Sequence, residues 1–377
     1  MEDPRLRNRL LVDATKLQTL CLDPLDDGMT DEDLKYPDGK ALRRFHSVAV
    51  PLTAENAAPA VIRQLPSMSN LEEAQAVCLL FMVIGSVIYI PCGAVFACLV
   101  LSWTKLLVLV CCTAVATVIL DKLVPDNSWP PYRFPSRIRL LLCKYFGFKL
   151  IFPPDEVFRN KDNTRQHFIM AGAPHGVVPL GDILGCLTCP LGPINGLGAP
   201  AALRAPLWGK LLRQMGLVSC EKESAIRFMN EGQGRSIGVM PGGIAEIFLT
   251  NDDTEGAFLL KRKGFCKLAI QAGRPLVPCY TFGNTQVFHC LTGSFLRRLS
   301  AILRISVTLF WGRWGLPVPF RKPILLCCGA PIDVVQCDNP TQKQIDALHT
   351  TFLEAMQELF DAHKGMYGWP QKRLAFE

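Results

Sequence analysis

The longest apolar stretch of the chain runs from Val77 to Leu120 and contains a single charged residue, Lys105. One helical span of a bilayer needs about 20 apolar residues, so this stretch is too long for one span and suits two. We therefore predict a transmembrane hairpin over residues 76–120. A pair of buried core helices is the alternative, although so long an apolar run is unusual in soluble proteins.

Two positions for the turn of this hairpin compete. A turn at 91–93 would place Lys105 inside the second leg, at a cost of about 2.5–3.5 kcal/mol. A turn at 102–105 places Trp103 and Lys105 at a membrane interface, where both residue types are favoured. We prefer the second position, although it shortens the second leg.

Beyond about residue 150 the pattern changes to brief apolar runs separated by helix-like stretches. Short apolar runs that end near Gly or Pro are typical of buried strands. Their alternation with helices predicts an α/β domain with a mostly parallel sheet flanked by helices. The predicted strands are 167–171, 236–240, 276–282, 305–310 and 324–328, and the predicted helices include 202–215 and 264–272.

The last predicted element is an amphipathic helix. Thr341 and Gln344 form a capping box after Pro340, and apolar residues at helical spacing follow as far as Phe360. Gly365 is the expected C-cap.

The N-terminal segment, residues 1–75, mixes acidic clusters with Pro and Ala and shows no long periodic pattern. We expect it to be largely disordered. Its first ten residues lack a hydrophobic core and do not form a cleavable signal peptide.

Cations dominate the residues that follow the hairpin. By the positive-inside rule they place the domain 121–377 in the cytosol. Residues 136–149 fit either a basic amphipathic helix lying on the membrane or an ordinary surface helix. The cations are Lys122, Arg133, Arg137, Arg139, Lys144 and Lys149, and only Asp121 and Asp126 oppose them.

Composition narrows the class of protein. The net charge of +7 is spread out, which suits a membrane surface or an anionic co-substrate better than nucleic acid. The 16 cysteines form no disulfide framework, which indicates a reducing compartment. Cys186 and Cys189 form one Cys-x-x-Cys pair without a second pair, so we predict no metal site.

The most informative stretch for chemistry is Ala173-Pro174-His175-Gly176. It places a histidine where a predicted buried strand meets a loop. Histidine has the unperturbed pKa that suits proton abstraction near neutral pH. A structural turn residue is the alternative. No P-loop or Gly-x-Gly-x-x-Gly unit occurs, which argues against NTPases and Rossmann dehydrogenases.

A second candidate follows the predicted strand 236–240. In Pro241-Gly242-Gly243 the paired glycines allow close approach of the backbone to a ligand or another strand. Glu246 is expected to open the next helix, where the helix dipole favours a carboxylate, and to orient a histidine or bind a polar head group. An ordinary residue at a helix start is the alternative.

The third candidate is the basic cluster Lys261-Arg262-Lys263 with Gly264 and Phe265. Cations at a helix start, beside free N–H groups, form an anion site. The alternative is a solvated surface run.

Taken in order, these motifs resemble the type-2 diacylglycerol acyltransferase family, which includes monoacylglycerol acyltransferases and wax-ester synthases. The resemblance covers about residues 130–366 and is most specific in the blocks 262–283 and 340–364. It implies acyl transfer from acyl-CoA to a neutral-lipid hydroxyl, at the endoplasmic reticulum membrane and on lipid droplets.

The chain departs from related patterns in two places. Animal members have a polar residue where Ala173 stands. The His-x4-Asp pair of glycerophosphate acyltransferases is missing, because Leu180 occupies the position of the aspartate and the nearest carboxylate is Asp182. Glu246 is therefore the expected partner of His175.

We thus expect an acyl-CoA:diacylglycerol O-acyltransferase in which His175 is the general base and Glu246 orients its ring. Monoacylglycerol and long-chain alcohols are the alternative acceptors, and a lipid-binding or lipid-droplet scaffold protein is the non-enzymatic alternative. No cofactor is expected beyond acyl-CoA as co-substrate; diacylglycerol and membrane lipids are the other partners, and homo-oligomerisation is left open. The expected substrate-binding residues are Pro174, Gly176, Pro241, Gly242, Gly243, Arg262, Lys263, Gly264 and Phe265.

Overall fold

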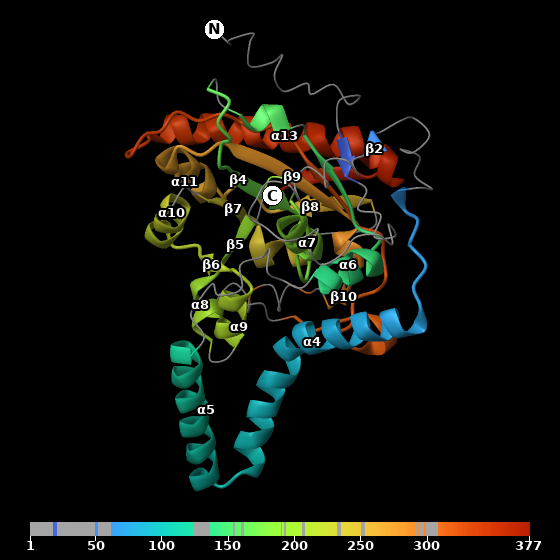
Figure 1. The fold of residues 1–377 in the computed structure, drawn as a ribbon, viewed down its shortest axis with the longest axis vertical. Coiled ribbons are helices and arrows are strands. Elements are labelled where there is room, and N and C mark those ends of the chain that lie inside the picture. The colour runs from blue at the N-terminus through green and yellow to red at the C-terminus, as the bar shows by residue number, and fades with distance from the viewer. Residues whose placement is uncertain are drawn as a thin grey trace.

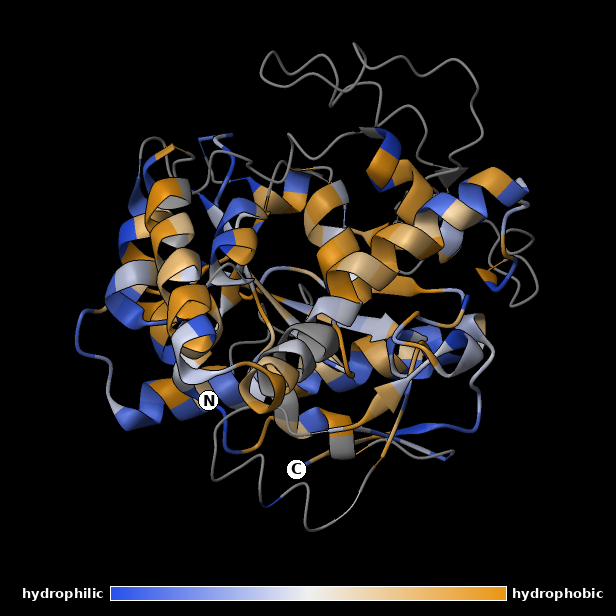
Figure 2. Ribbon diagram, turned by 90° about the horizontal axis from the view of Figure 1, so that it is seen from below, coloured by the Kyte–Doolittle hydropathy of each residue, from blue (hydrophilic) through white to orange (hydrophobic). Residues whose placement is uncertain are grey.

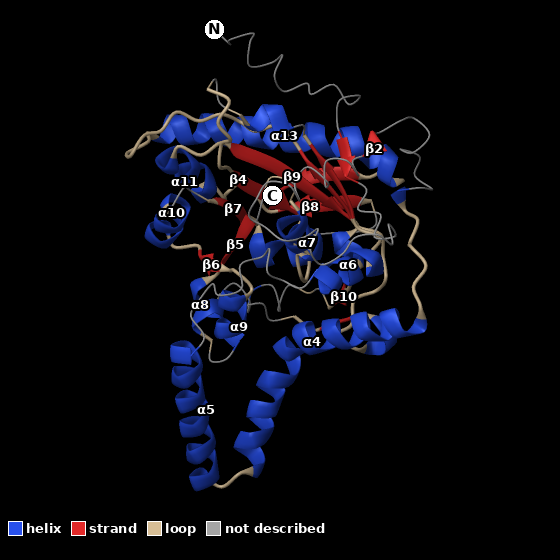
Figure 3. Ribbon diagram, in the orientation of Figure 1, coloured by secondary structure: helices blue, strands red, loops and turns tan. Residues whose placement is uncertain are grey.

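A nine-stranded sheet runs through the computed structural model, with helices on both of its faces (Figure 1, Figure 3). The strand order is β2-β1-β3-β12-β9-β4-β7-β5-β6. From β9 to β6 all neighbours are parallel, and β12 is parallel to β3 but antiparallel to β9. The mixed α/β class and the mostly parallel sheet flanked by helices are therefore confirmed.

The structure describes residues 18–20, 50–51, 62–123 and 136–377, the last with gaps at 154, 160–161, 190, 192–193, 206–207, 232–234, 250–252, 292, 294–297 and 299–307. Its strands are β1 Gln18–Leu20, β2 Val50–Pro51, β3 Lys149–Phe152, β4 Ile169–Ala173, β5 Ile194–Gly198, β6 Val218–Ser219, β7 Ser236–Val239, β8 Thr254–Ala257, β9 Leu276–Phe282, β10 His289–Cys290, β11 Phe310–Trp311, β12 Leu325–Cys328 and β13 Arg373–Phe376. Its helices are α4 Asn70–Val100, α5 Trp103–Leu123, α6 Ser136–Tyr145, α7 Leu180–Thr188, α8 Pro200–Arg204, α9 Trp208–Gln214, α10 Lys222–Asn230, α11 Gly264–Ala272 and α13 Gln342–Tyr367, with 3-10 turns η3 Asp155–Phe158, η4 Gly243–Phe248, η5 Asn284–Gln286 and η6 Arg313–Gly315.

The central strands are buried on both faces, as expected of parallel strands between helix layers. In β4, Ile169 and Ala171 face a core formed with α10, α11 and α13, whereas Met170 faces a core formed with α4, α6 and α7. This burial explains why the strand appears in the sequence as a continuous apolar run.

Several predicted elements differ from the structure at their ends. The predicted helix 136–149 ends at Tyr145 because Gly147 turns the chain with a positive φ and β3 begins at Lys149. Tyr145 is buried, so this helix packs on the domain. The C-cap of α13 is Gly368 rather than Gly365, since the left-handed conformation occurs at Gly368. The capping box at the start of α13 is confirmed.

Two further predicted elements match the structure only in part. The predicted helix 202–215 becomes α8 and α9. The predicted strand 305–310 lies mostly outside the described residues, and β11 begins at Phe310.

The predicted disordered segment 1–75 also lies mostly outside the described residues. Within it, β1 pairs with β3 and β2, and α4 begins at Asn70 through a capping box between Ser69 and Glu72. Lys144 of α6 donates to Glu72 across 2.7 Å, which joins the start of α4 to the domain.

The later part of α4 projects from the domain together with α5 as a hairpin (Figure 1), and α5 is coloured largely hydrophobic in Figure 2. The predicted turn at 102–105 is too long: the break between the helices lies at 101–102, and residues 103–105 form the first turn of α5. The alternative turn at 91–93 lies inside α4. The first part of α4 packs on the domain through Ala76, Leu80 and Ile84. Among the described residues, no helix is both long enough and apolar enough to cross a membrane.

Candidate active site

The loops after β4 and β7 meet at one edge of the sheet. These strands are parallel neighbours, so their carboxyl ends lie together, although β5 and β6 separate them in the sequence. After β4 the chain enters α7 on one face, and after β7 it leads to α11 on the other face. Open α/β sheets bind their ligands where the chain diverges in this way. The edge between β4 and β7 is thus the candidate site.

His175 lies half-buried in the loop after β4, and a neighbouring residue of the same loop orients its imidazole ring. Its Nδ1 lies 2.8 Å from the carbonyl oxygen of Gly176. Because a carbonyl only accepts hydrogen bonds, Nδ1 carries the proton and Nε2 is left with its lone pair. Burial lowers the pKa of the His175 imidazole, against the contact with Gly176, which raises it. The ring is therefore neutral near pH 7 and able to accept a proton at Nε2.

Glu246 contacts the same loop, but through the backbone. Its Oε2 accepts a hydrogen bond from the amide of His175 at 2.6 Å, and its Oε1 accepts one from the amide of Phe258 at 3.0 Å. The expected contact with the imidazole ring is not the one observed, since Gly176 takes that place. Burial raises the pKa of the Glu246 carboxyl to about 8, against both amides, which lower it.

Gly242 is required for this arrangement. Glu246 sits in the 3-10 turn η4, and its side chain folds back over Gly242 so closely that a methyl group there would overlap the carboxylate. Gly243 adopts a positive φ of 57° with open space around it. The predicted Pro241-Gly242-Gly243 loop therefore serves to position Glu246, and Gly243 leaves room beside it.

Asn284 is a residue of this site that the sequence analysis missed. It is 1% exposed, and its Nδ2 donates to the carbonyl oxygens of His175 (3.0 Å) and Pro174 (3.3 Å). Its Oδ1 accepts from the amide of Gly181 at 3.2 Å. A side chain at Gly176 would have its Cβ 2.9 Å from Nδ2, which accounts for glycine after the histidine. A polar residue just after the predicted strand 276–282 was the available signal, because β9 is parallel to β4.

Asp182 is a second buried carboxyl near this edge. Thr281 donates to its Oδ2 at 2.9 Å, and burial raises its pKa to about 7. Within the described part of the chain, its Oδ1 has no hydrogen-bond partner. It faces Gly172 of β4, where a methyl group would overlap it. Among the described residues, no hydrogen bond joins Asp182 to the His175 ring.

The basic cluster is divided by the fold. Arg262 stacks on Phe258 at 5.1 Å and acts electrostatically on Glu246, so it lies beside the site. Lys263 pairs with Asp346 at 2.7 Å. Phe265 is buried with its ring 4.8 Å from that of Phe352, and is a core residue rather than a ligand contact. Gly264, at the start of α11, has open space where a side chain would be.

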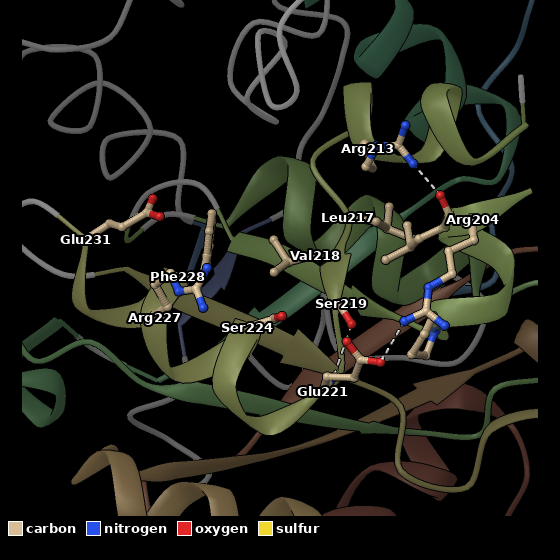
Figure 4. Close-up of a pocket in the computed structure, with 12 residues that line it drawn as sticks. Arg204, Arg213, Leu217, Val218, Ser219, Glu221, Ser224, Arg227, Phe228 and Glu231 are labelled. Atoms are coloured by element: carbon tan, nitrogen blue, oxygen red, sulfur yellow. Dashed lines mark hydrogen bonds and ion pairs between the residues drawn. The ribbon is translucent and has the colours of Figure 1, made fainter. Parts of the chain in front are cut away.

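A cavity of about 460 Å³ lies elsewhere, along the edge strand β6 between α8, α9 and α10 (Figure 4). It does not include His175, and the hydrogen-bond geometry makes the β4–β7 edge the better candidate for chemistry. The described residues contain no group of three His, Cys, Asp or Glu side chains that could hold a metal ion.

The sequence of this chain matches a known family. A family model described as diacylglycerol acyltransferase matches residues 100–377. The chain belongs to the diacylglycerol acyltransferase family. The predicted family and the predicted acyltransferase class of enzyme are confirmed.

Curated relatives match part of the chain. Human diacylglycerol O-acyltransferase 2-like protein 6 is 31% identical over 61% of this chain and 75% of its own length. Bovine 2-acylglycerol O-acyltransferase 1 is 37% identical over 46% of this chain and 55% of its own length. Human diacylglycerol O-acyltransferase 2 is 30% identical over 60% and 64%. No solved structure matches the chain.

Proposed function

We propose that this protein transfers an acyl group from acyl-CoA to the hydroxyl of diacylglycerol, which gives triacylglycerol and free coenzyme A. The observation that carries the proposal is the neutral His175 with a free Nε2, in a member of this family, at the divergence point of the sheet. Residues 173–200 contain Asp182 as their only charged side chain, which disfavours a phosphorylated acceptor.

In the proposed reaction, Nε2 of His175 takes the proton of the acceptor hydroxyl as its oxygen attacks the thioester carbonyl. The carbon–sulfur bond then breaks, and the imidazolium returns the proton to the departing thiolate. Backbone N–H groups at Gly176 and at Gly242-Gly243 are the candidates for stabilising the oxyanion. The amide of His175 is excluded from that role because it donates to Glu246.

Glu246 is a positioning residue in this scheme. It fixes the His175 loop to the segment at Phe258 through two backbone amides. Arg262, beside this segment, attracts the anionic co-substrate by its charge.

We further propose that residues 76–120 are inserted in the endoplasmic reticulum membrane, with the catalytic domain in the cytosol, and that the protein also reaches lipid droplets. The exposed apolar side chains on α4 and α5 support this, among them Phe96 (65% exposed), Leu99 (80%) and Trp103 (86%). Diacylglycerol lies in the bilayer and would reach His175 laterally. Protease treatment of sealed microsomes should digest tags at both ends of the chain; protection of one end would contradict the hairpin.

An acceptor panel tests the activity. Microsomes from cells that cannot make triacylglycerol, expressing the full chain, receive labelled acyl-CoA with diacylglycerol, monoacylglycerol or a long-chain alcohol. We expect label in triacylglycerol. Monoacylglycerol is the second candidate because a relative is named 2-acylglycerol O-acyltransferase. Label only in wax ester or phosphatidic acid would refute the proposed acceptor, and no acyl-CoA consumption by pure protein would favour a lipid-binding role.

A further inference from the structure

We propose that the cavity along β6 binds the two phosphorylated parts of coenzyme A, its diphosphate and its ribose 3′-phosphate. This inference rests on the proposed function and assigns the co-substrate's polar end to a defined place. The cavity volume of about 460 Å³ is in the range of small-molecule sites. Three arginines from three different helices line it: Arg204 of α8, Arg213 of α9 and Arg227 of α10.

The arginines lie at two ends of the cavity, as Figure 4 shows. The guanidinium group of Arg204 is directed at Glu221 and that of Arg213 at the carbonyl oxygen of Leu203, whereas Arg227 lies on the other side of Ser224. Guanidinium groups bind phosphate oxygens in a bidentate manner, which makes arginine the preferred residue for such ligands. Two separated arginine positions suit a ligand with two separated phosphate groups. The apolar Leu217 and Val218 between them offer a surface for the adenosine.

The ion pair of Arg204 is exchangeable, whereas Arg213 donates to the backbone carbonyl oxygen of Leu203. Arg204 pairs with Glu221 at 3.0 Å, but the side chains are 74% and 48% exposed, and exposed ion pairs contribute little to stability. Glu231, the other acidic residue of the cavity, lies 3.7 Å from Arg235. Within the described part of the chain, no carboxylate pairs with Arg227. A phosphate can therefore engage Arg227 without breaking an existing contact.

Strand register places the cavity within reach of His175. Ser219 of β6 is paired with Gly198 of β5. The registers of β5 with β7 and of β7 with β4, continued to the ends of these strands, place Gly172 of β4 at about the same height in the sheet. Three strand spacings separate β6 from β4, about 14 Å. The phosphopantetheine arm is about five residue lengths, roughly 16–18 Å when extended. A coenzyme A molecule with its phosphates in the cavity can thus present its thioester at His175.

This geometry also orients the ligand. Arg204 lies in the short helix α8, which begins just after the carboxyl end of β5 on the side of the catalytic edge. Arg227 lies in the last turn of α10, away from that edge, and Arg213 lies in the last turn of α9, which leads to the start of β6. The diphosphate is nearer the thioester than the 3′-phosphate is. Arg204 is therefore assigned to the diphosphate and Arg227 to the 3′-phosphate.

Equilibrium binding of labelled coenzyme A and of dephospho-coenzyme A to the purified full chain tests this assignment without turnover. Arg227→Ala should weaken coenzyme A roughly tenfold and leave dephospho-coenzyme A unchanged, because the latter lacks the 3′-phosphate. Arg204→Ala should weaken both ligands. Arg373→Ala, an exposed arginine on β13, removes the same charge as a control and should change neither.

Equal effects of Arg227→Ala on both ligands, or no effect on either, would overturn the assignment. Flotation with vesicles containing phosphatidylserine separates the other source of phosphate. If Arg227→Ala abolished vesicle binding and left coenzyme A affinity intact, the cavity would be a lipid-headgroup site and the proposal would be refuted. If the arginine variants bound coenzyme A with unchanged affinity and the protein made triacylglycerol, the cavity would not be the coenzyme A site, but the proposed function would stand. If the protein bound coenzyme A in the cavity and transferred no acyl group, the proposed function would be refuted and the assignment of the cavity would stand.

Discussion

The loop at His175 and the cavity along β6 hold their polar groups in opposite ways. At His175 the contacts are buried and mostly directed at backbone: Glu246 and Asn284 together fix the loop by four hydrogen bonds to groups at Pro174, His175 and Gly181. In the cavity, the Arg204 side chain is mostly exposed and its partner is exchangeable. The difference separates a fixed geometry for chemistry from an adaptable surface for a charged ligand.

The largest effect is expected from replacing the proposed general base, His175. His175→Ala removes the proton acceptor, and we expect acyl transfer to fall by about 10²–10⁴-fold. The measurement is the rate of triacylglycerol formation with labelled acyl-CoA. His289→Ala, at an exposed histidine on β10, is the control and should retain activity. Near-normal turnover by His175→Ala would remove His175 from the mechanism.

Asn284→Ala tests whether the buried loop contacts are needed for chemistry rather than binding. It removes the donor to Pro174 and His175 and the acceptor for Gly181, so the imidazole loses its fixed place. We expect kcat to fall about 10–100-fold with KM for acyl-CoA little changed. The exposed Asn339→Ala is the matched control. A change in KM alone would mean that the loop binds substrate instead of positioning the base.

Glu246→Gln tests the other loop contact, with a readout in pH. The amide can satisfy one of the two backbone N–H groups, so we expect kcat to fall about tenfold. The acid limb of the pH profile should stay below the usual histidine pKa near 6.5 in both proteins, because Glu246 does not contact the ring. Glu358→Gln, exposed on α13, is the control. A shifted acid limb in Glu246→Gln would restore the ring-orienting role.

Thermal melts of the wild type and Glu246→Gln test whether the pKa of the Glu246 carboxyl is raised on folding. The folded pKa of about 8 is raised, so the carboxyl's stabilising contribution is complete below its usual pKa of 4.5 and is lost as the pH rises toward 8. The melting temperature of the wild type should therefore decline relative to Glu246→Gln between pH 5 and pH 8. A relative gain by the wild type would show that the two amides outweigh burial and keep the carboxylate ionised.

The smallest expected effects come from the basic cluster. Arg262→Ala should raise KM for acyl-CoA about two- to threefold at low salt, because its charge, held over the Phe258 ring, acts near the site at a range that salt screens. Lys263→Ala should leave KM unchanged and slightly lower stability, since its ammonium pairs with Asp346. A larger effect of Lys263→Ala on KM would return the phosphate site to this cluster.

Local patterns were sufficient for single elements of this fold. The strand Leu276–Phe282 and the start of α13 were predicted at the residues where they occur, because each is encoded by consecutive residues or by a cap. The position of Glu246 after a predicted strand suggests a carboxylate that orients a histidine, and the family resemblance identifies that histidine as His175. The physical cause of their pairing, the insertion of β7 beside β4, is a long-range property of the sheet.

Two contacts at the site that no local pattern predicts have the same origin. Lys263 appeared to be available for an anion, and its partner Asp346 lies 83 residues further along the chain. Asn284 appeared to be a loop residue, and its role depends on β9 lying next to β4. Which atom of a neighbour a carboxylate contacts, as with Glu246 and the His175 amide, is decided by packing that no local pattern contains.

The length of helix α4 determines the direction in which α5 lies relative to the domain. It is continuous from Asn70 to Val100, with Ala76, Leu80 and Ile84 locked in the core and Leu99 exposed at its far end. Each residue inserted into an α-helix turns everything beyond it by about 100° and advances it by about 1.5 Å. Single insertions or deletions between Ile84 and Leu99 would swing α5 around the domain, so length changes here are tolerable only in steps close to whole turns.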